Sequence, residues 1–364
     1  MASIWAVPEL PGLLSRAEVA QTAASIAAAQ ERDGAIPWSV GAHTDTWNHV
    51  ESAMGLLVGG QVEAAHRAYD WCLATQRDDG SWPMKVVAGV VQDASSETNM
   101  SAYLAVGVWH HWLVRSDESF VRRCWPAVRR GLDFVVSMQL DFGGVAWSRE
   151  AGGKVNDEAL LAGSSSIFQA LAAGIALSEL MADPQPEWEL AAGRLGHALR
   201  EHRDLFMDKS TFSMDWYYPV LGGAVRGDAG RALIDSRWSD FVVPGLGVRC
   251  VDTNPWVTGA ETCELVLALD ALGDRDRAVR LLGDMQHLRH DDGSYWTGYV
   301  FDDEVRWPRE QTTYTAGVVV LAVDALSFGT PGSDVFRGTS LPAGFPVIGL
   351  ECGCADEAAP QRVG

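Results

Sequence analysis

The sequence predicts an all-α protein built as an (α/α)6 toroid, a ring of six helical hairpins. Two observations support this fold class. Four turns share one signature, a Gln followed by Gly and then Trp, and a repeated signature indicates a repeat architecture. Stretches with helical periodicity also alternate between two kinds, one amphipathic and one apolar on nearly all sides. We expect the second kind to form the inside of the ring and the first kind its outside.

The four signatures place turns along most of the chain. They read Gln30…Gly34…Trp38, Gln76…Gly80…Trp82, Gln139…Gly143-Gly144…Trp147 and Gln286…Gly293…Trp296. The long gap before the last one has room for two repeats that have lost the signature. Glycine permits a tight turn after a helix, and a Gln amide can bond to loose backbone groups there. We therefore expect the signature residues to serve the scaffold.

The alternation predicts six outer and six inner helical segments. The outer segments are residues 16–30, 62–76, 119–139, 187–205, 229–238 and 274–288. The inner segments are residues 47–58, 96–113, 158–180, a small-residue stretch after Asp215-Trp216-Tyr217-Tyr218, 256–272 and 311–326. No strand-like run is longer than the short piece at residues 85–91. We assign residues 1–328 to the toroid and residues 329–364, which are rich in Gly and Pro, to an extended tail.

Composition narrows the function classes. The 364 residues are 47% hydrophobic, enough for one large core or two ordinary domains. A net charge of −20 without a basic stripe argues against a nucleic-acid groove. No apolar stretch is long enough to span a bilayer, and no basic leader precedes the first apolar residues. We expect a cytoplasmic protein with a small-molecule substrate. Cys352 and Cys354 form a loose thiol pair without spaced partner ligands, so we predict no metal site.

Two repeats carry a longer motif before the Gln, and a third, Arg277-Ala278…Leu281-Leu282…Gln286, carries it with a lengthened turn. A basic residue, a small residue and bulky apolar residues precede it in Arg67-Ala68…Trp71…Gln76 and in Arg130-Gly131…Phe134-Val135…Gln139. The chain resembles the terpenoid cyclase and protein prenyltransferase superfamily, whose QW repeat has this form. The resemblance implies an α-toroid enzyme that acts on an isoprenoid, with Mg²⁺ needed if the substrate is a diphosphate. No residue matches the DxDD, DDxxD or zinc-ligand motifs of that superfamily, so its catalytic residues cannot be carried over.

Acidic residues gather where the inner segments begin. Parallel inner helices bring all their N-termini to one end of the ring, and Glu51, Glu97 and Glu261 fall at equivalent positions there. Glu261 lies inside an otherwise apolar helix, where an unpaired carboxylate is costly or takes up a proton. The aspartates that precede these glutamates (Asp45, Asp93 and Asp252) are largely explained as helix caps.

We predict Glu51, Glu97, Asp157 and Glu261 as the catalytic carboxylates. The predicted substrate-binding residues around them are Trp47, His49, Asp93, Trp216, Tyr217, Asp252, Trp256, Trp307 and Tyr314.

Three functions remain open at this point. The first is the isoprenoid cyclase or transferase that the resemblance implies. The second is a carbohydrate-active enzyme of glycoside hydrolase type, in which Glu97 or Asp157 pairs with Glu261 as general acid and base while aromatic rings stack on a sugar. The third is a non-catalytic toroid that binds a polar or cationic ligand.

Overall fold

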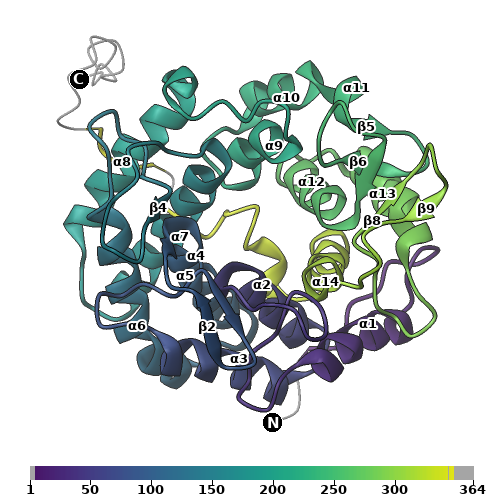
Figure 1. The fold of residues 1–364 in the computed structure, drawn as a ribbon, viewed down its shortest axis with the longest axis horizontal. Helices are drawn as coiled ribbons and strands as arrows, with labels where there is room; N and C mark the ends of the chain where they lie inside the picture. Colours follow the sequence, from purple (N-terminus) through teal and green to yellow (C-terminus); the bar gives the residue numbers. More distant parts are fainter. Residues whose placement is uncertain (1–4, 343, 348–364) are drawn as a thin grey trace, which may run out of the picture.

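The computed structural model describes residues 5–342 and 344–347, and the (α/α)6 toroid is confirmed (Figure 1). The outer ring contains α1 (Arg16–Ala29), α3 (Val62–Thr75), α6 (Glu118–Val136), α8 (Pro186–Glu201), α10 (Gly227–Ser236) and α13 (Arg275–Asp284). The inner ring contains α2 (Thr46–Val58), α4 (Thr98–Ala102) with α5 (Leu104–Arg115), α7 (Leu161–Leu180), α9 (Ser213–Leu221), α12 (Gly259–Ala271) and α14 (Thr313–Ser327). Short helices α11 (Trp238–Phe241), η1 (Arg203–Leu205), η2 (Met285–Leu288) and η3 (Pro331–Asp334) lie between or after them.

Each inner helix packs against the next, and α14 packs against α2, so the inner ring closes on itself. The burial of the two rings follows their sequence patterns. In α14 every residue from Thr313 to Leu326 is buried, whereas α13 buries only Ala278, Leu281 and Leu282. A helix that is apolar all round belongs in a core, and an amphipathic helix belongs at its surface.

The Gln of the signature joins one repeat to the next. Gln76 Nε2 donates hydrogen bonds to the carbonyl of Gly80 in its own turn and to the carbonyl of Ala127 on α6, both at 2.9 Å. Gln30 and Gln139 make the same pair of bonds to their own turns and to α3 and α8. A Cβ on Gly80 would lie 2.1 Å from the carbonyl oxygen of Arg130, also on α6. The scaffold role predicted for this motif is therefore visible as a contact between neighbouring hairpins.

The described residues contain nine short strands, of which the sequence indicated only the piece at residues 85–91. β1 (Lys85–Val87) pairs with β2 (Val90–Asp93), and β3 (Ser96–Glu97) pairs with β4 (Ser148–Arg149). An antiparallel sheet joins β5 (Val242–Val243), β6 (Gly247–Arg249), β7 (Trp256–Thr258), β8 (Gly298–Val300) and β9 (Val305–Arg306) in that order. Strands of two to four residues are too short to show alternation in a sequence.

After α14 the chain continues into η3, which packs against α5 and α14. Val335 and Phe336 are buried in the core. Cys352 and Cys354 lie outside the described residues. Among those that are described, α7 alone is long and apolar enough to cross a membrane, but 83% of its apolar window is buried inside the protein. A buried core helix passes the same test of length and composition.

Candidate active site

The loops that lead from each outer helix to its inner partner emerge at one end of the toroid, which we call the mouth (Figure 1). Most of the predicted site residues lie on these loops or at the inner N-termini beneath them. The order of contacts around the inner ring places the second repeat, which contains α4 and α5, three steps from the fifth, which contains α12. Glu97 and Glu261 therefore belong to opposite walls of the ring.

Glu97 is a buried carboxyl group at the mouth. It ends β3 and forms the N-cap position of α4, and only 9% of it is exposed. Burial raises its pKa to about 8, and the nearby Asp45 carboxylate adds to the rise. Gly163 on α7 faces it, since a Cβ there would lie 3.9 Å from Glu97 Oε1. Glu97 is thus protonated at neutral pH and can donate a proton.

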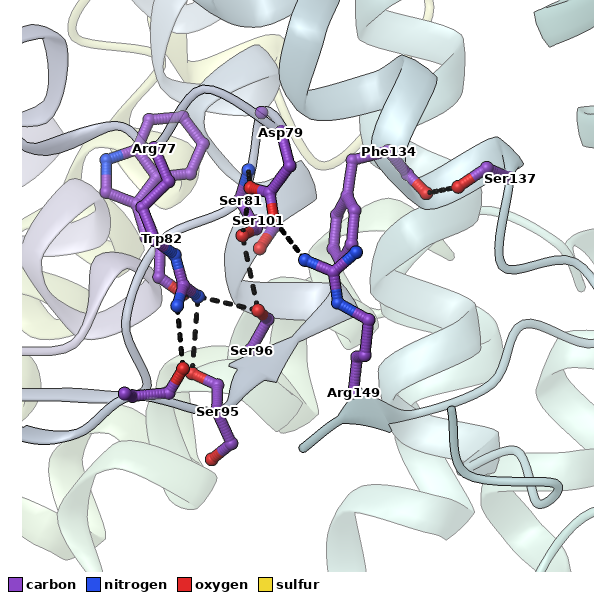
Figure 2. A network of polar contacts seen from close by, with 12 residues as sticks. Arg77, Asp79, Ser81, Trp82, Ser95, Ser96, Ser101, Phe134, Ser137 and Arg149 are labelled. Atoms are coloured by element: carbon purple, nitrogen blue, oxygen red, sulfur yellow. Dashed lines mark hydrogen bonds and ion pairs between the residues drawn. The ribbon is translucent and has the colours of Figure 1, made fainter. Parts of the chain in front are cut away.

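A polar network that includes Arg77, Ser81 and Ser96 fixes the backbone of β3 (Figure 2). Arg77, the residue after the signature Gln76, donates from Nη1 to the carbonyl of Ala94 at 2.6 Å and from Nη2 to Ser96 Oγ at 2.6 Å. Ser96 Oγ in turn donates to Ser81 Oγ at 3.2 Å. On the other side, β3 pairs with β4, whose Arg149 forms an ion pair with Asp79. These contacts leave Glu97 little freedom to shift.

Asp45 approaches Glu97 from the first repeat. It caps α2 by accepting a hydrogen bond from the backbone NH of Asn48 at 3.0 Å, as its predicted capping role requires. His43 Nε2 lies 3.6 Å from its second oxygen. Only 2% of Asp45 is exposed, so its charge acts on Glu97 through protein rather than through water.

A second acidic centre lies deeper in the ring, at Glu264 on α12. Its carboxylate accepts hydrogen bonds from the phenols of Tyr217 and Tyr218 on α9 and of Tyr314 on α14. Burial raises its pKa to about 7, while the three phenols act in the opposite direction. The carboxylate is completely buried, so it orders the tyrosines around it and does not touch solvent.

Glu51 faces this centre from α2. It is 1% exposed, and its pKa is raised well above the ordinary value by burial and then by the charge of Glu264. Above the two carboxyls stands an aromatic cluster centred on Trp47, whose ring lies 5.9 Å from Tyr103, 5.8 Å from Tyr218 and 6.3 Å from Tyr314. Glu51 and Glu264 therefore form a buried floor under these rings.

Glu261 corrects one detail of the sequence prediction. It is the third residue of α12, in the first turn, and is partly exposed, whereas we expected it deep inside the helix. The reason is β7, whose pairing with β6 and β8 keeps residues 256–258 extended and delays the helix start to Gly259. Glu264, one turn later, is the carboxyl that stands inside the apolar helix, at the position that Glu51 has in α2.

The remaining predicted residues divide between the mouth and structural roles. Asp157 is exposed on the loop before α7, and Asp93 caps the turn at Ser95. Asp252 forms an ion pair with Arg237 at 2.6 Å. His49 is fully buried, accepts a hydrogen bond from the NH of Ile36 and lies 2.8 Å from the carbonyl of Ala68, so its ring nitrogens face the outer layer.

The predicted tryptophans lie in three places. Trp216 stacks on Phe241 and lines a cavity of about 470 Å³ beside Asp215, which is also lined by the segment at residues 203–210 and by Leu233 of α10. Trp256 and Trp307 contact each other on the five-stranded sheet at the mouth, with ring centroids 5.2 Å apart. Trp47 alone of the predicted tryptophans belongs to the cluster above Glu51 and Glu264.

Sequence reasoning missed Glu264, Tyr218 and Tyr103 as members of the site. One signal for Glu264 was available, because it follows Glu261 by three residues and so shares its helix face. Tyr103 gave no signal, since it sits at the break between α4 and α5 where no motif is present.

Comparison with known proteins decides the family. No family model matches the chain. The chain is 56% identical over 350 residues to MMP endo-(1,4)-3-O-methyl-alpha-D-mannosidase from Mycolicibacterium hassiacum, and the match covers 96% of this chain and 97% of that protein. The chain belongs to the family of this mannosidase. Such a match over nearly full length identifies it as an enzyme.

Solved structures agree in fold. A glycosidase variant in complex with glucose has a TM-score of 0.70 at 16% identity, covering 85% of this chain and 97% of that one. A D-mannose isomerase has a TM-score of 0.63 at 11% identity, covering 84% and 96%. At these identities the likeness shows the toroid alone.

The isoprenoid cyclase or transferase prediction is therefore wrong, and the resemblance to terpenoid cyclases and prenyltransferases did not identify the family. The physical reason lies in the signature itself. Its Gln and Gly bond one hairpin to the next and contact no part of the site, so any closed ring of hairpins can use them. We expected Mg²⁺ only for a diphosphate substrate, so this expectation no longer applies once the isoprenoid prediction is abandoned. The carbohydrate-active alternative is the one that the family supports.

Proposed function

We propose that the chain hydrolyses internal α-(1,4) bonds between 3-O-methyl-mannose residues, with Glu97 as general acid and Glu261 as general base. The observation that carries the proposal is the pairing of a protonated carboxyl on one wall with a partly exposed carboxyl on the opposite wall. The substrate class comes from the relative that shares 56% of its residues over nearly the whole chain.

In the proposed reaction, Glu97 gives its proton to the glycosidic oxygen as the bond from that oxygen to the anomeric carbon breaks. Glu261 takes a proton from a water molecule, whose oxygen forms the new bond to the anomeric carbon. Carboxyls on opposite walls leave room for that water, which is the arrangement of inverting glycosidases. Burial, assisted by the charge of Asp45, keeps Glu97 protonated, and the Trp47 cluster offers ring faces for stacking on a sugar.

Position in the ring separates the roles of Glu97 and Glu261 at the mouth from those of the other acids. Glu51 and Glu264 are buried beneath the aromatic rings, so we assign them to positioning rather than to proton transfer. Asp157, the other predicted partner of Glu261, is exposed on the loop before α7, so we assign it no role in proton transfer. Two carboxyl groups suffice for this chemistry. We also retain a cytoplasmic location as part of the proposal.

The test is hydrolysis of a defined 3-O-methyl-α-(1,4)-mannooligosaccharide, followed by proton NMR of the first product. We expect the β anomer to appear first, and we expect Glu97→Gln and Glu261→Gln each to lose at least about 10³-fold in kcat. Full turnover in both variants would remove the assignment. First release of the α anomer would instead indicate a retaining mechanism and a nucleophile closer to Glu97, for which Asp45, whose charge acts on Glu97, would be the candidate.

A further inference from the structure

Exposed large hydrophobic side chains concentrate at the mouth. Of the eleven found among the described residues, eight lie on loops that lead from an outer helix to its inner partner. We call these eight the apolar rim: Val40, Val90, Val91, Val155, Leu205, Phe212, Val305 and Trp307. They come from five of the six repeats. Single exposed hydrophobic residues are ordinary, but their collection on one end of the molecule calls for a binding partner.

The fold does not require these residues to be apolar. In the β1–β2 hairpin, Val86 is buried, while Val90 and Val91 on the partner strand point to solvent. A polar residue at either position would keep the same strand pairing. The rim is therefore better explained by what it contacts than by what it stabilises.

Trp307 is the largest member of the rim and is held in place. Its side chain is 54% exposed, its backbone carbonyl accepts a hydrogen bond from Trp256 Nε1 at 2.8 Å, and the two rings meet edge to face at 75°. An aromatic face that is already oriented loses little conformational freedom when a ligand stacks on it. Such a face suits the CH-rich side of a sugar ring.

We propose that the apolar rim binds the flanking residues of an O-methylated mannan chain, outside the residues that are cleaved. This inference rests on the proposed function. An endo-acting enzyme must hold a chain that continues on both sides of the scissile bond, and each methyl ether replaces a polar hydroxyl by apolar surface. Burial of that surface against valine, leucine and aromatic side chains is favourable because it removes apolar surface from water.

Charge favours this occupant over a membrane. The chain carries a net charge of −20, which opposes approach to an anionic lipid surface but has no effect on a neutral polysaccharide. The loops that carry the rim lead into the same inner N-termini at which Glu97 and Glu261 stand, so a chain lying across these loops would lead into the site.

The experiment compares chain lengths. A variant combining Val90→Ser, Val91→Ser and Trp307→Ala is assayed on the shortest oligosaccharide that is cleaved and on a long 3-O-methyl-mannan. We expect kcat/KM to fall about tenfold on the long chain and less than twofold on the short one, because only the long chain reaches the rim. The control is Trp5→Ala, which removes an exposed aromatic side chain at the opposite end, where it is bonded to the carbonyl of Val114. We expect the control to change neither value.

Measuring binding without turnover tests the role of the apolar rim separately from the proposed hydrolysis. With Glu97→Gln as background, calorimetry with the long methylated chain measures affinity without turnover. Loss of affinity on removing the rim residues supports the rim even if hydrolysis of this substrate fails. Equal effects on short and long chains, or equal affinity for methylated and unmethylated mannan, would overturn it. Vesicle binding or self-association that disappears in the rim variant, with no loss of mannan affinity, would also overturn it.

Discussion

Asp45, the N-cap residue of the first inner helix, adds its charge to the burial that raises the pKa of Glu97, the N-cap residue of the second. Residues of two neighbouring hairpins thus set the pKa of one acid, and the contribution of Asp45 to that pKa can be measured. In Asp45→Asn we expect the pKa of Glu97 to fall, because the negative charge that opposes its ionisation is gone. The alkaline limb of the kcat/KM profile should then move to lower pH, as seen in initial rates between pH 5 and 9.

Asp303→Asn provides the matched control for this profile, since Asp303 is an exposed acid in the turn between β8 and β9. Its alkaline limb should stay in place. An unchanged limb in Asp45→Asn as well would show that Glu97 is not the titrating acid.

The buried Glu97 should also lower the free energy of unfolding of the protein at neutral pH. Its pKa is about 8 when folded against an ordinary value of 4.5, so the unfolded chain releases this proton at lower pH than the native chain. The contribution of Glu97 to the free energy of unfolding is therefore fully present below pH 4.5 and is lost as the pH rises to 8. Glu97→Gln should be more stable than the parent at pH 7, by at most about 3 kcal/mol at 1.36 kcal/mol per pKa unit. Urea unfolding at pH 5 and pH 7 measures the difference, which should shrink at the lower pH.

Gly80 tests the clamp between repeats. Its φ of +88° and the 2.1 Å approach of a Cβ to the Arg130 carbonyl both oppose any side chain. Gly89 has a similar φ of +76° but nothing within 4 Å of its Cβ position. We expect Gly89→Ala to cost about 1 kcal/mol of backbone strain, and Gly80→Ala to cost about 1–3 kcal/mol more through the clash. Equal costs in chemical denaturation would show that the contact with α6 is not tight.

Removing the phenol oxygen of Tyr218 should lower the free energy of unfolding more than removing that of Tyr69. Tyr218 donates to the Glu264 carboxylate at 2.6 Å, whereas Tyr69 donates to the neutral carbonyl of Gly107 at 2.9 Å. Removing a bond to a charged acceptor costs about 1.5–3 kcal/mol, against about 0.5–1.5 kcal/mol for a neutral one. The penalty for Tyr218→Phe should also decrease below pH 7 as Glu264 takes up a proton. A penalty for Tyr218→Phe that is the same at pH 5.5 and pH 8.5 would contradict an ionised Glu264.

The sequence allowed the ring to be predicted because its evidence is local. A Gln, a Gly and a Trp in one turn, and helices with or without a polar face, can be recognised within a few residues. The substrate could not be predicted, because the site is assembled across repeats. Glu264 needs tyrosines from α9 and α14, and Glu97 needs Asp45 from the preceding hairpin. The position of Glu261 depended on β7, whose three residues pair with segments on either side in sequence and give no periodic signal.

The turn of the last repeat contacts the first outer helix, since Gly293 packs against the backbone of Gln21 and Gln21 Nε2 donates to the carbonyl of Asp291. An open array of repeats can lengthen or shorten by duplication, because each unit contacts only its neighbours. Here the last unit must meet the first, so one hairpin more or fewer would leave this seam unmatched. Changes in the loops at the mouth leave this seam untouched, so they can alter the site while the ring stays closed.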